Sequence, residues 1–215
     1  MKGKEIWEIW LIDKKRRDLD FQRYLISKKI KKETETKEII AGHLEKADHN
    51  LRFVQTTLSL EEFNDWAIVS AYYSIYHASL ALCALKGYST KDHNATLLIL
   101  IKEFYNNGLS KEEIETVGKT SIEKEDVLYY IQAKAKRNEA SYSTKSLFDR
   151  QEAESLRLKA IAFINKVKEI IEFGENIIEP ELRPEYLEKL KRIKKEGYGE
   201  TFTSIEQLRK KIEKK

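Results

Sequence analysis

The chain has 215 residues, of which 41% are hydrophobic and 35% are charged, and its mean hydropathy is −0.59. These values exclude a protein made mainly of membrane spans and indicate a soluble globular protein of one or two domains. The single cysteine, Cys83, excludes an intramolecular disulfide and lies in an apolar run, where we expect a small core residue in a reducing compartment. The N-terminal sequence becomes strongly charged after a short apolar patch, unlike a signal peptide, so a cytoplasmic protein is expected.

The formal net charge of +4 is unevenly distributed along the chain. Residues 1–32 carry a net charge of +6 and residues 179–215 carry +3, which leaves −5 for the residues between them. We therefore expect a basic N-terminal arm (1–32), a helical bundle (33–178) and a basic C-terminal helical tail (179–215). Basic arms can bind phosphates by releasing counterions, but lysine-rich helix faces are often simply solvated, so both interpretations stay open.

Apolar residues spaced alternately four and three apart predict a first helix with one buried face. These residues are Ile40, Leu44, Ala47, Leu51, Val54 and Leu58. A capping box of Ser59 and Glu62 predicts that a second helix begins near Leu60, and Gly87 predicts its end.

The second helix contains the run WAIVSAYYSIYHASLALCAL, residues 66–85, which has no formal charge. A helix of this length spans about 30 Å, enough to cross a bilayer. The run contains three tyrosines, three serines and a histidine, all of which need hydrogen-bond partners that lipid does not offer. We therefore predict a central helix buried by protein, around which the amphipathic helices pack, and no membrane contact.

Further helices are predicted between Gly87 and the tail. One runs from about His93 to Tyr105 and ends before the breaker Asn-Asn-Gly. A capping box of Ser110 and Glu113 opens a shorter helix, and another lies over residues 127–136.

The last long helix is predicted to be capped at Asp149, with Glu152 three residues later. Its buried face consists of Ala153, Leu156, Ala160, Phe163, Val167 and Ile170. Only the N-terminal run IWEIWLI hints at the period of two that a strand would require, so the fold class is all-α.

Pro180 and Pro184 interrupt the helical pattern and mark a boundary. Beyond them, two short amphipathic helices surround the sequence YGETFT. Such short apolar stripes are marginal alone. We expect the tail either to fold back on the core or to bind a partner.

The sequence from Asn64 to Tyr105 resembles the second and third helices of HEPN domains, especially an archaeal and bacterial subgroup with a Tyr-Tyr-x-x-Tyr/Phe-His-Ala run. The matching positions are Tyr72, Tyr73, Tyr76, His77, Ala78, Gly87, Lys91 and His93. The resemblance continues through AKRNEASYS, residues 135–143, and covers roughly residues 35–178. It implies an up-and-down bundle of four to five helices that pairs as a homodimer, here with a short helical C-terminal extension.

Catalytic HEPN proteins are metal-independent RNases whose motif is an arginine followed four to six residues later by a histidine. Cleavage by the ribose 2′-hydroxyl needs a proton acceptor, a proton donor and a cation for the phosphorane, and two copies of the motif meet in the dimer cleft. The resemblance assigns Arg137 and the polar Asn138 to this motif, with Tyr142 in place of the histidine. A tyrosine of pKa near 10 is a poor general base, although it can donate a hydrogen bond or stack on a base. Thr144 stands where the family carries a tyrosine that an adenylyltransferase partner modifies.

The candidate catalytic residues are therefore Arg137, Asn138 and Tyr142, and the candidate binding-cleft residues are Tyr73, Tyr76, His77 and His93. Arg137 has a simpler alternative as an ion-paired surface residue. His77 and His93 have one as hydrogen-bonded core groups.

Other kinds of site receive no support from the sequence. His43 and His49 are six residues apart, about 240° round a helix, and do not face one site. There is no Glu-x-x-His pair, Gly-rich phosphate loop or nucleophile elbow, so we expect no metal and no cofactor.

Three hypotheses about function follow. The first is a homodimer in a toxin–antitoxin or related defence pair, with a minimal nucleotidyltransferase as partner, that binds RNA or a nucleotide in the dimer cleft. The second is an endoribonuclease in which Tyr142 or His77 takes the role of the missing histidine. The third is a non-catalytic scaffold whose residues 179–215 bind a partner.

Overall fold

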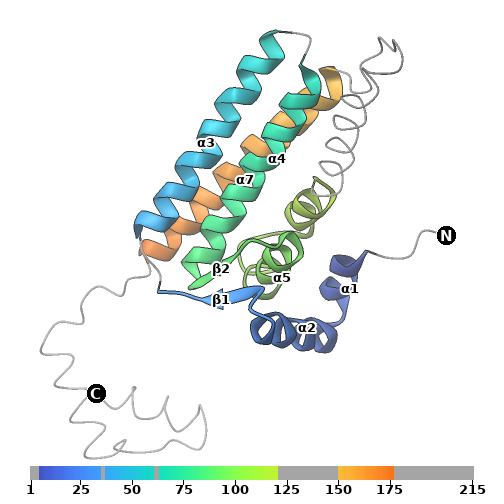
Figure 1. The fold of residues 1–215 in the computed structure, drawn as a ribbon, viewed down its shortest axis with the longest axis vertical. Coiled ribbons are helices and arrows are strands. Elements are labelled where there is room, and N and C mark those ends of the chain that lie inside the picture. The colour runs from blue at the N-terminus through green and yellow to red at the C-terminus, as the bar shows by residue number, and fades with distance from the viewer. Residues whose placement is uncertain (1–4, 35–36, 61–62, 121–149, 177–215) are drawn as a thin grey trace, which may run out of the picture. The chain divides into compact units, whose positions relative to one another are not determined.

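The computed structural model describes residues 5–34, 37–60, 63–120 and 150–176, with side chains up to Phe173. The elements in chain order are α1 (Ile6–Ile12), α2 (Lys14–Ile26), β1 (Ile30–Lys32), α3 (Lys37–Ser59), α4 (Asn64–Leu85), β2 (Tyr88–Thr90), α5 (His93–Glu103), a helical segment at 111–120, and α7 (Arg150–Asn176) (Figure 1). The prediction of an all-α protein is confirmed, with two three-residue strands as the addition. The chain forms two compact units, Met1–Glu172 and Phe173–Lys215, and the elements up to Glu172 make the first.

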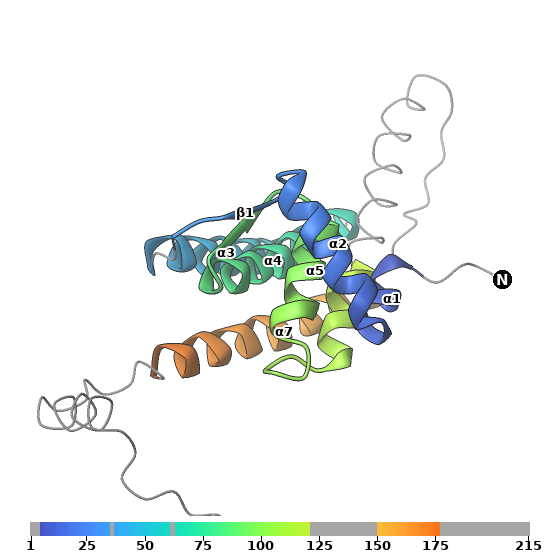
Figure 2. The same cartoon turned by 90° about the horizontal axis from the view of Figure 1, so that it is seen from below.

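Helices α3, α4 and α7 run alongside one another and form the long part of the bundle (Figures 1 and 2). The Ser74 hydroxyl donates a hydrogen bond to the carbonyl of Ala47 at 2.7 Å, which joins α4 to α3. Lys168 of α7 reaches Asp48 of α3 at 2.9 Å. The first contact fixes how side chains of α4 meet those of α3, and the second ties α7 to α3.

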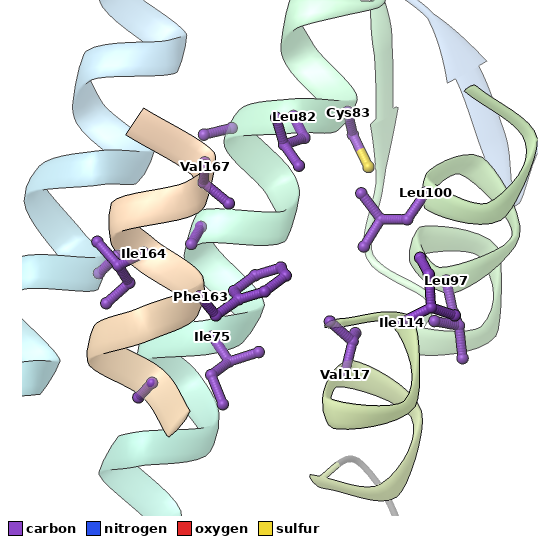
Figure 3. Packing of buried hydrophobic residues seen from close by; sticks show 14 of the residues in the cluster. Ile75, Leu82, Cys83, Leu97, Leu100, Ile114, Val117, Phe163, Ile164 and Val167 are labelled. Carbon is purple, nitrogen blue, oxygen red and sulfur yellow. The ribbon is translucent and has the colours of Figure 1, made fainter. Parts of the chain in front are cut away.

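The central position predicted for the uncharged run is confirmed. In α4, 78% of the most apolar 18-residue window is buried inside the protein, although the helix is long and apolar enough to cross a membrane. Figure 3 shows Phe163 of α7 beside Ile75 of α4, and Cys83 facing Leu100 of α5. Cys83 is fully buried, and burial raises the pKa of its thiol, as expected for a core residue and not for a nucleophile.

The predicted start of this helix is wrong. Ser59 lies in the last turn of α3, where its hydroxyl donates to the carbonyl of Thr56 at 2.6 Å, so the hydroxyl is used within α3. Helix α4 begins at Asn64, after Phe63, and not near Leu60.

Other helix ends agree with the sequence. Helix α5 begins at His93, as predicted, and Asp92 caps it by accepting from the Ala95 amide at 2.8 Å. The capping box at Ser110 is confirmed, because its amide donates to Glu113 and the Glu113 amide donates back to its hydroxyl at 3.4 Å. The cap predicted at Asp149 and the helix predicted over 127–136 lie outside the described residues. Of the face predicted for α7, all but Ile170 is buried, and Ile170 is half-buried.

The N-terminal segment is folded into the same compact unit as the bundle. Trp7, Trp10, Phe21 and Ile30 are buried in the common core. The run IWEIWLI is helix α1 and not a strand. The boundary expected at residue 32 therefore does not separate two compact units, because Met1–Glu172 is one.

One contact joins α1 to α2 within this segment, and another joins the segment to the bundle. The Trp10 indole donates a hydrogen bond to the buried carboxylate of Asp20 at 3.0 Å. Burial raises the pKa of Asp20, but the hydrogen bonds from Trp10 and Arg16 outweigh burial and hold this pKa below its ordinary value. Strand β1 pairs antiparallel with β2, with Ile30 opposite Thr90. Both strands are too short for an alternating pattern to be recognised in the sequence.

Gly118 offers a test of how tightly α1 packs. A Cβ atom added there would lie 2.8 Å from the indole of Trp7, which is itself buried. Gly118→Ala is expected to lower the free energy of unfolding by about 1 kcal/mol, because the clash exceeds the gain in helix propensity. Gly42→Ala in α3 is the control: nothing lies within 4 Å of its added Cβ, and it should stabilise by about 0.5–1 kcal/mol. Urea unfolding measures both, and stabilisation by both would contradict the packing.

Candidate functional site

A hollow of about 790 Å³ lies where β1, β2, α4 and the start of α5 meet. Its volume is in the range of small-molecule binding sites. Three groups of side chains line it, namely rings, lysines and acids.

The first group is a cluster of rings from α4 and α5. Tyr72 and Tyr76 are four residues apart on one face of α4, and their rings stack at 5.9 Å with an angle of 10°. The cap at Asp92 places His93 in the first turn of α5, where its ring lies 4.5 Å from the ring of Tyr76 and hydrogen-bonds the Tyr72 hydroxyl. Tyr73, Tyr76 and His93 line the hollow, whereas Tyr72 is buried behind them.

The chemistry of this cluster at neutral pH follows from its burial. Burial raises the pKa of Tyr76, so this residue is a neutral phenol at pH 7. A neutral phenol can donate a hydrogen bond and present a ring face, but it cannot act as a base. The cluster is therefore suited to holding a flat ligand.

His77, the fourth predicted cleft residue, is paired with His43 of α3. Their Nδ1 atoms lie 3.3 Å apart, within hydrogen-bond distance, and their ring centres lie 5.6 Å apart. Burial, and then His43, lower the pKa of His77 to about 4. Burial, and then Lys46, also lower the pKa of His43. Both rings are neutral at pH 7, so one donates and the other accepts. His43 lines the hollow, whereas His77 is not among its lining residues.

The second and third groups are charged. Lys28, Lys29, Lys31 and Lys91 line the hollow together with Glu33 and Asp92. Lys29 is paired with Asp92 at 2.9 Å, and Glu33 accepts from the Ser89 hydroxyl. Burial raises the pKa of Asp92, but the hydrogen bonds from Lys29 and the Ala95 amide lower it further than burial raises it. The hollow therefore carries an excess of positive charge.

The predicted catalytic residues Arg137, Asn138 and Tyr142 lie outside the described residues. Among the described residues, no group of three or more His, Cys, Asp or Glu side chains could hold a metal ion.

Sequence reasoning missed His43 and the lysines before residue 32. A usable signal existed for His43, because α3 and α4 are antiparallel and His43 and His77 lie at nearly equal distances from the turn between them. The lysines were visible as the +6 charge of residues 1–32, but nothing in the sequence showed which of them would face a hollow.

Comparison with known proteins identifies the family. The profile of the HEPN domain matches residues 40–173. The chain belongs to the HEPN family. It is also 30% identical over 139 residues to the protein named "Putative toxin MJ0142" of Methanocaldococcus jannaschii, an alignment that covers 64% of this chain and 84% of that protein. The resemblance to HEPN domains is thereby confirmed, and a toxin-like or RNase-like family role is supported.

The HEPN match begins at Ile40, after the N-terminal elements. Lys28, Lys29, Lys31 and Glu33 therefore precede it, whereas the ring cluster lies within it. One wall of the hollow comes from the family domain and another from the segment that precedes it.

Proposed function

We propose that this HEPN protein is the toxin-like member of a toxin–antitoxin or related defence pair, and that it binds RNA or a nucleotide. The carrying observation is the ring cluster of Tyr73, Tyr76 and His93, which faces a hollow with an excess of lysine charge in a HEPN domain. Rings stack on bases and lysines attract phosphates, so this combination suits nucleic-acid components. The name of the M. jannaschii relative supports the toxin role.

The proposal includes a homodimer in the cytoplasm with a minimal nucleotidyltransferase as partner. In the dimer cleft, Arg137 would bind phosphate, Asn138 would donate a hydrogen bond, and Tyr142 would stack on a base or donate to an oxygen. Homodimer formation supplies two copies of this motif to one cleft.

A second candidate is a metal-independent endoribonuclease in which Tyr142 or His77 takes the place of the missing histidine. The low pKa of His77 favours this role in one respect, since a general base must be unprotonated at working pH. A base of pKa about 4 is also weak, so cleavage by this route is expected to be slow.

One set of variants tests both candidates. Arg137→Ala is expected to weaken RNA binding about tenfold and to relieve growth inhibition on expression, because a phosphate loses its cation. Arg52→Ala, at an exposed arginine of α3, is the control and should match wild type. Binding is measured by titration with labelled single-stranded RNA, and the products are examined for 2′,3′-cyclic phosphate ends.

The outcomes separate the two candidates. Cyclic phosphate ends from wild type but not from Arg137→Ala would establish the endoribonuclease. Equal cleavage by both would rule it out. A wild-type protein that binds neither RNA nor nucleotides, with Arg137→Ala leaving growth unchanged, would refute the first candidate.

A further inference from the structure

The lysines of the hollow differ in whether an acid neutralises them. Lys29 is held by Asp92, whereas Lys28, Lys31 and Lys91 form no ion pair with any described residue. Lys28 and Lys31 come from the segment that precedes the family match, and Lys91 comes from the loop between β2 and α5. Three lysines that no described acid pairs with therefore line one hollow, where Glu33 is the acid that remains besides Asp92, and the net positive charge suits a ligand with more than one negative charge.

The backbone at Lys28 strengthens this interpretation. Lys28 has φ +58°, in the left-handed region that favours glycine, at the turn between α2 and β1. A lysine at this position costs stability relative to glycine, and its side chain lines the hollow. A lysine therefore occupies position 28, although the backbone conformation there favours glycine.

The remaining surface of the hollow provides a place for a base. Tyr73 and Tyr76 line it, and His43 and His93 are the other rings that do. A volume of about 790 Å³ is large enough for one or two nucleotides.

We propose that this hollow binds the terminal phosphate of a nucleotide, with the phosphate on Lys28, Lys31 and Lys91 and the base against Tyr73. The same chemistry occurs in a free nucleoside monophosphate and at the phosphorylated end of an RNA strand. The inference rests on the proposed function for the class of ligand. Beyond that function, it names the terminal phosphate as the group that is recognised, and it assigns this recognition to lysines of a single chain.

Calorimetric titration of the full chain with 5′-AMP and with adenosine tests the proposal. Adenosine is expected to bind at least about tenfold more weakly than 5′-AMP, because it lacks the charged group. Lys91→Glu should weaken 5′-AMP about tenfold and leave adenosine unchanged. Lys159→Glu makes the same change in net charge at an exposed lysine of α7 that does not line the hollow, and it should have less than a twofold effect. Equal affinity for both ligands, or equal losses in the two variants, would overturn the proposal.

Lys28→Gly separates binding from folding. The variant relieves the left-handed strain, so its Tm is expected to rise by about 2 °C while its affinity for 5′-AMP falls several-fold. A stabilised protein with unchanged affinity would remove Lys28 from the site.

A six-nucleotide RNA with and without a 5′-phosphate distinguishes the two sources of the ligand. Preference for the phosphorylated RNA over 5′-AMP indicates a strand end, and the reverse indicates a free nucleotide. If RNA binding depends on Arg137 but neither on the terminal phosphate nor on Lys91, the proposed function stands and this inference fails. Absence of any RNA or nucleotide binding would defeat both.

Discussion

Replacing Trp10 with alanine is expected to lower the free energy of unfolding by about 3–5 kcal/mol. The Trp10 side chain is 1% exposed, and its indole is a donor to the buried carboxylate of Asp20. The change removes a large apolar group and also leaves that carboxylate with one hydrogen bond fewer. A loss of this size would demonstrate that the N-terminal helices belong to the cooperative unit of the bundle.

Trp66→Ala provides the matched control. Trp66 is 44% exposed near the start of α4, so its removal should cost less than about 1 kcal/mol. Guanidinium unfolding followed by circular dichroism measures both variants. Equal small losses would mean that residues 1–32 behave as an arm whose packing contributes little to stability.

Acidification is expected to destabilise the protein through the histidine pair. The pKa of His77 is about 4 in the folded protein, below the ordinary 6.5, so the unfolded chain binds more protons between these values. The stabilisation is complete above pH 6.5 and is lost as the pH falls toward 4. The ring is half-buried, and after allowance for solvent screening we expect a loss of about 1–2 kcal/mol.

His77→Gln removes one of the two titrating rings and should make the dependence of stability on pH between 7 and 4.5 shallower, because His43 remains. The groups around this ring are His43 and Lys46 of α3 and Tyr76 of α4. His49→Gln, at an exposed position of α3, should leave the dependence unchanged. The comparison is made by urea unfolding at both pH values, and parallel curves for wild type and His77→Gln would show that the pair does not titrate as inferred.

The long helices could be predicted because the spacing of apolar residues in each one indicates which of its faces are buried. The one-sided spacing from Ile40 to Leu58 and the uncharged run of residues 66–85 correspond to an outer helix and a central one. The start of α4 could not be predicted in this way, because a serine hydroxyl serves as a cap or bonds back into the preceding turn depending on where that turn ends.

The packing of the N-terminal segment could not be predicted because its charge obscured it. Lys14, Lys15 and Arg16 are exposed, while Trp7 and Trp10 on the preceding helix are buried. A count of charges gives the average over both faces of a helix and therefore suggests a solvated arm. Only the three-dimensional arrangement reveals that one face is core.

Some residues of the candidate site could be predicted from the local sequence, and others depend on the fold. Tyr73, Tyr76 and His93 could be named from the resemblance, because they lie in one run and the turn that follows it. The partner of His77 and the lysines of β1 depend on which elements become neighbours in the fold, and that depends on contacts between residues 34 to 60 positions apart. Local sequence patterns contain little of this information.

The pairing of β1 with β2 links the docking of the N-terminal helices to the affinity of the hollow for a ligand. Lys31 is at the centre of β1, and Ile30 beside it is in the core, so the lysine reaches the hollow only while the N-terminal helices are docked. By mass action, a ligand held there would stabilise the docked state by RT ln(1 + [L]/Kd), which grows with ligand concentration. Protection of the N-terminal segment from proteases should therefore rise with ligand concentration, and a fragment trimmed to residues 40–173 would lose ligand affinity and part of its core together.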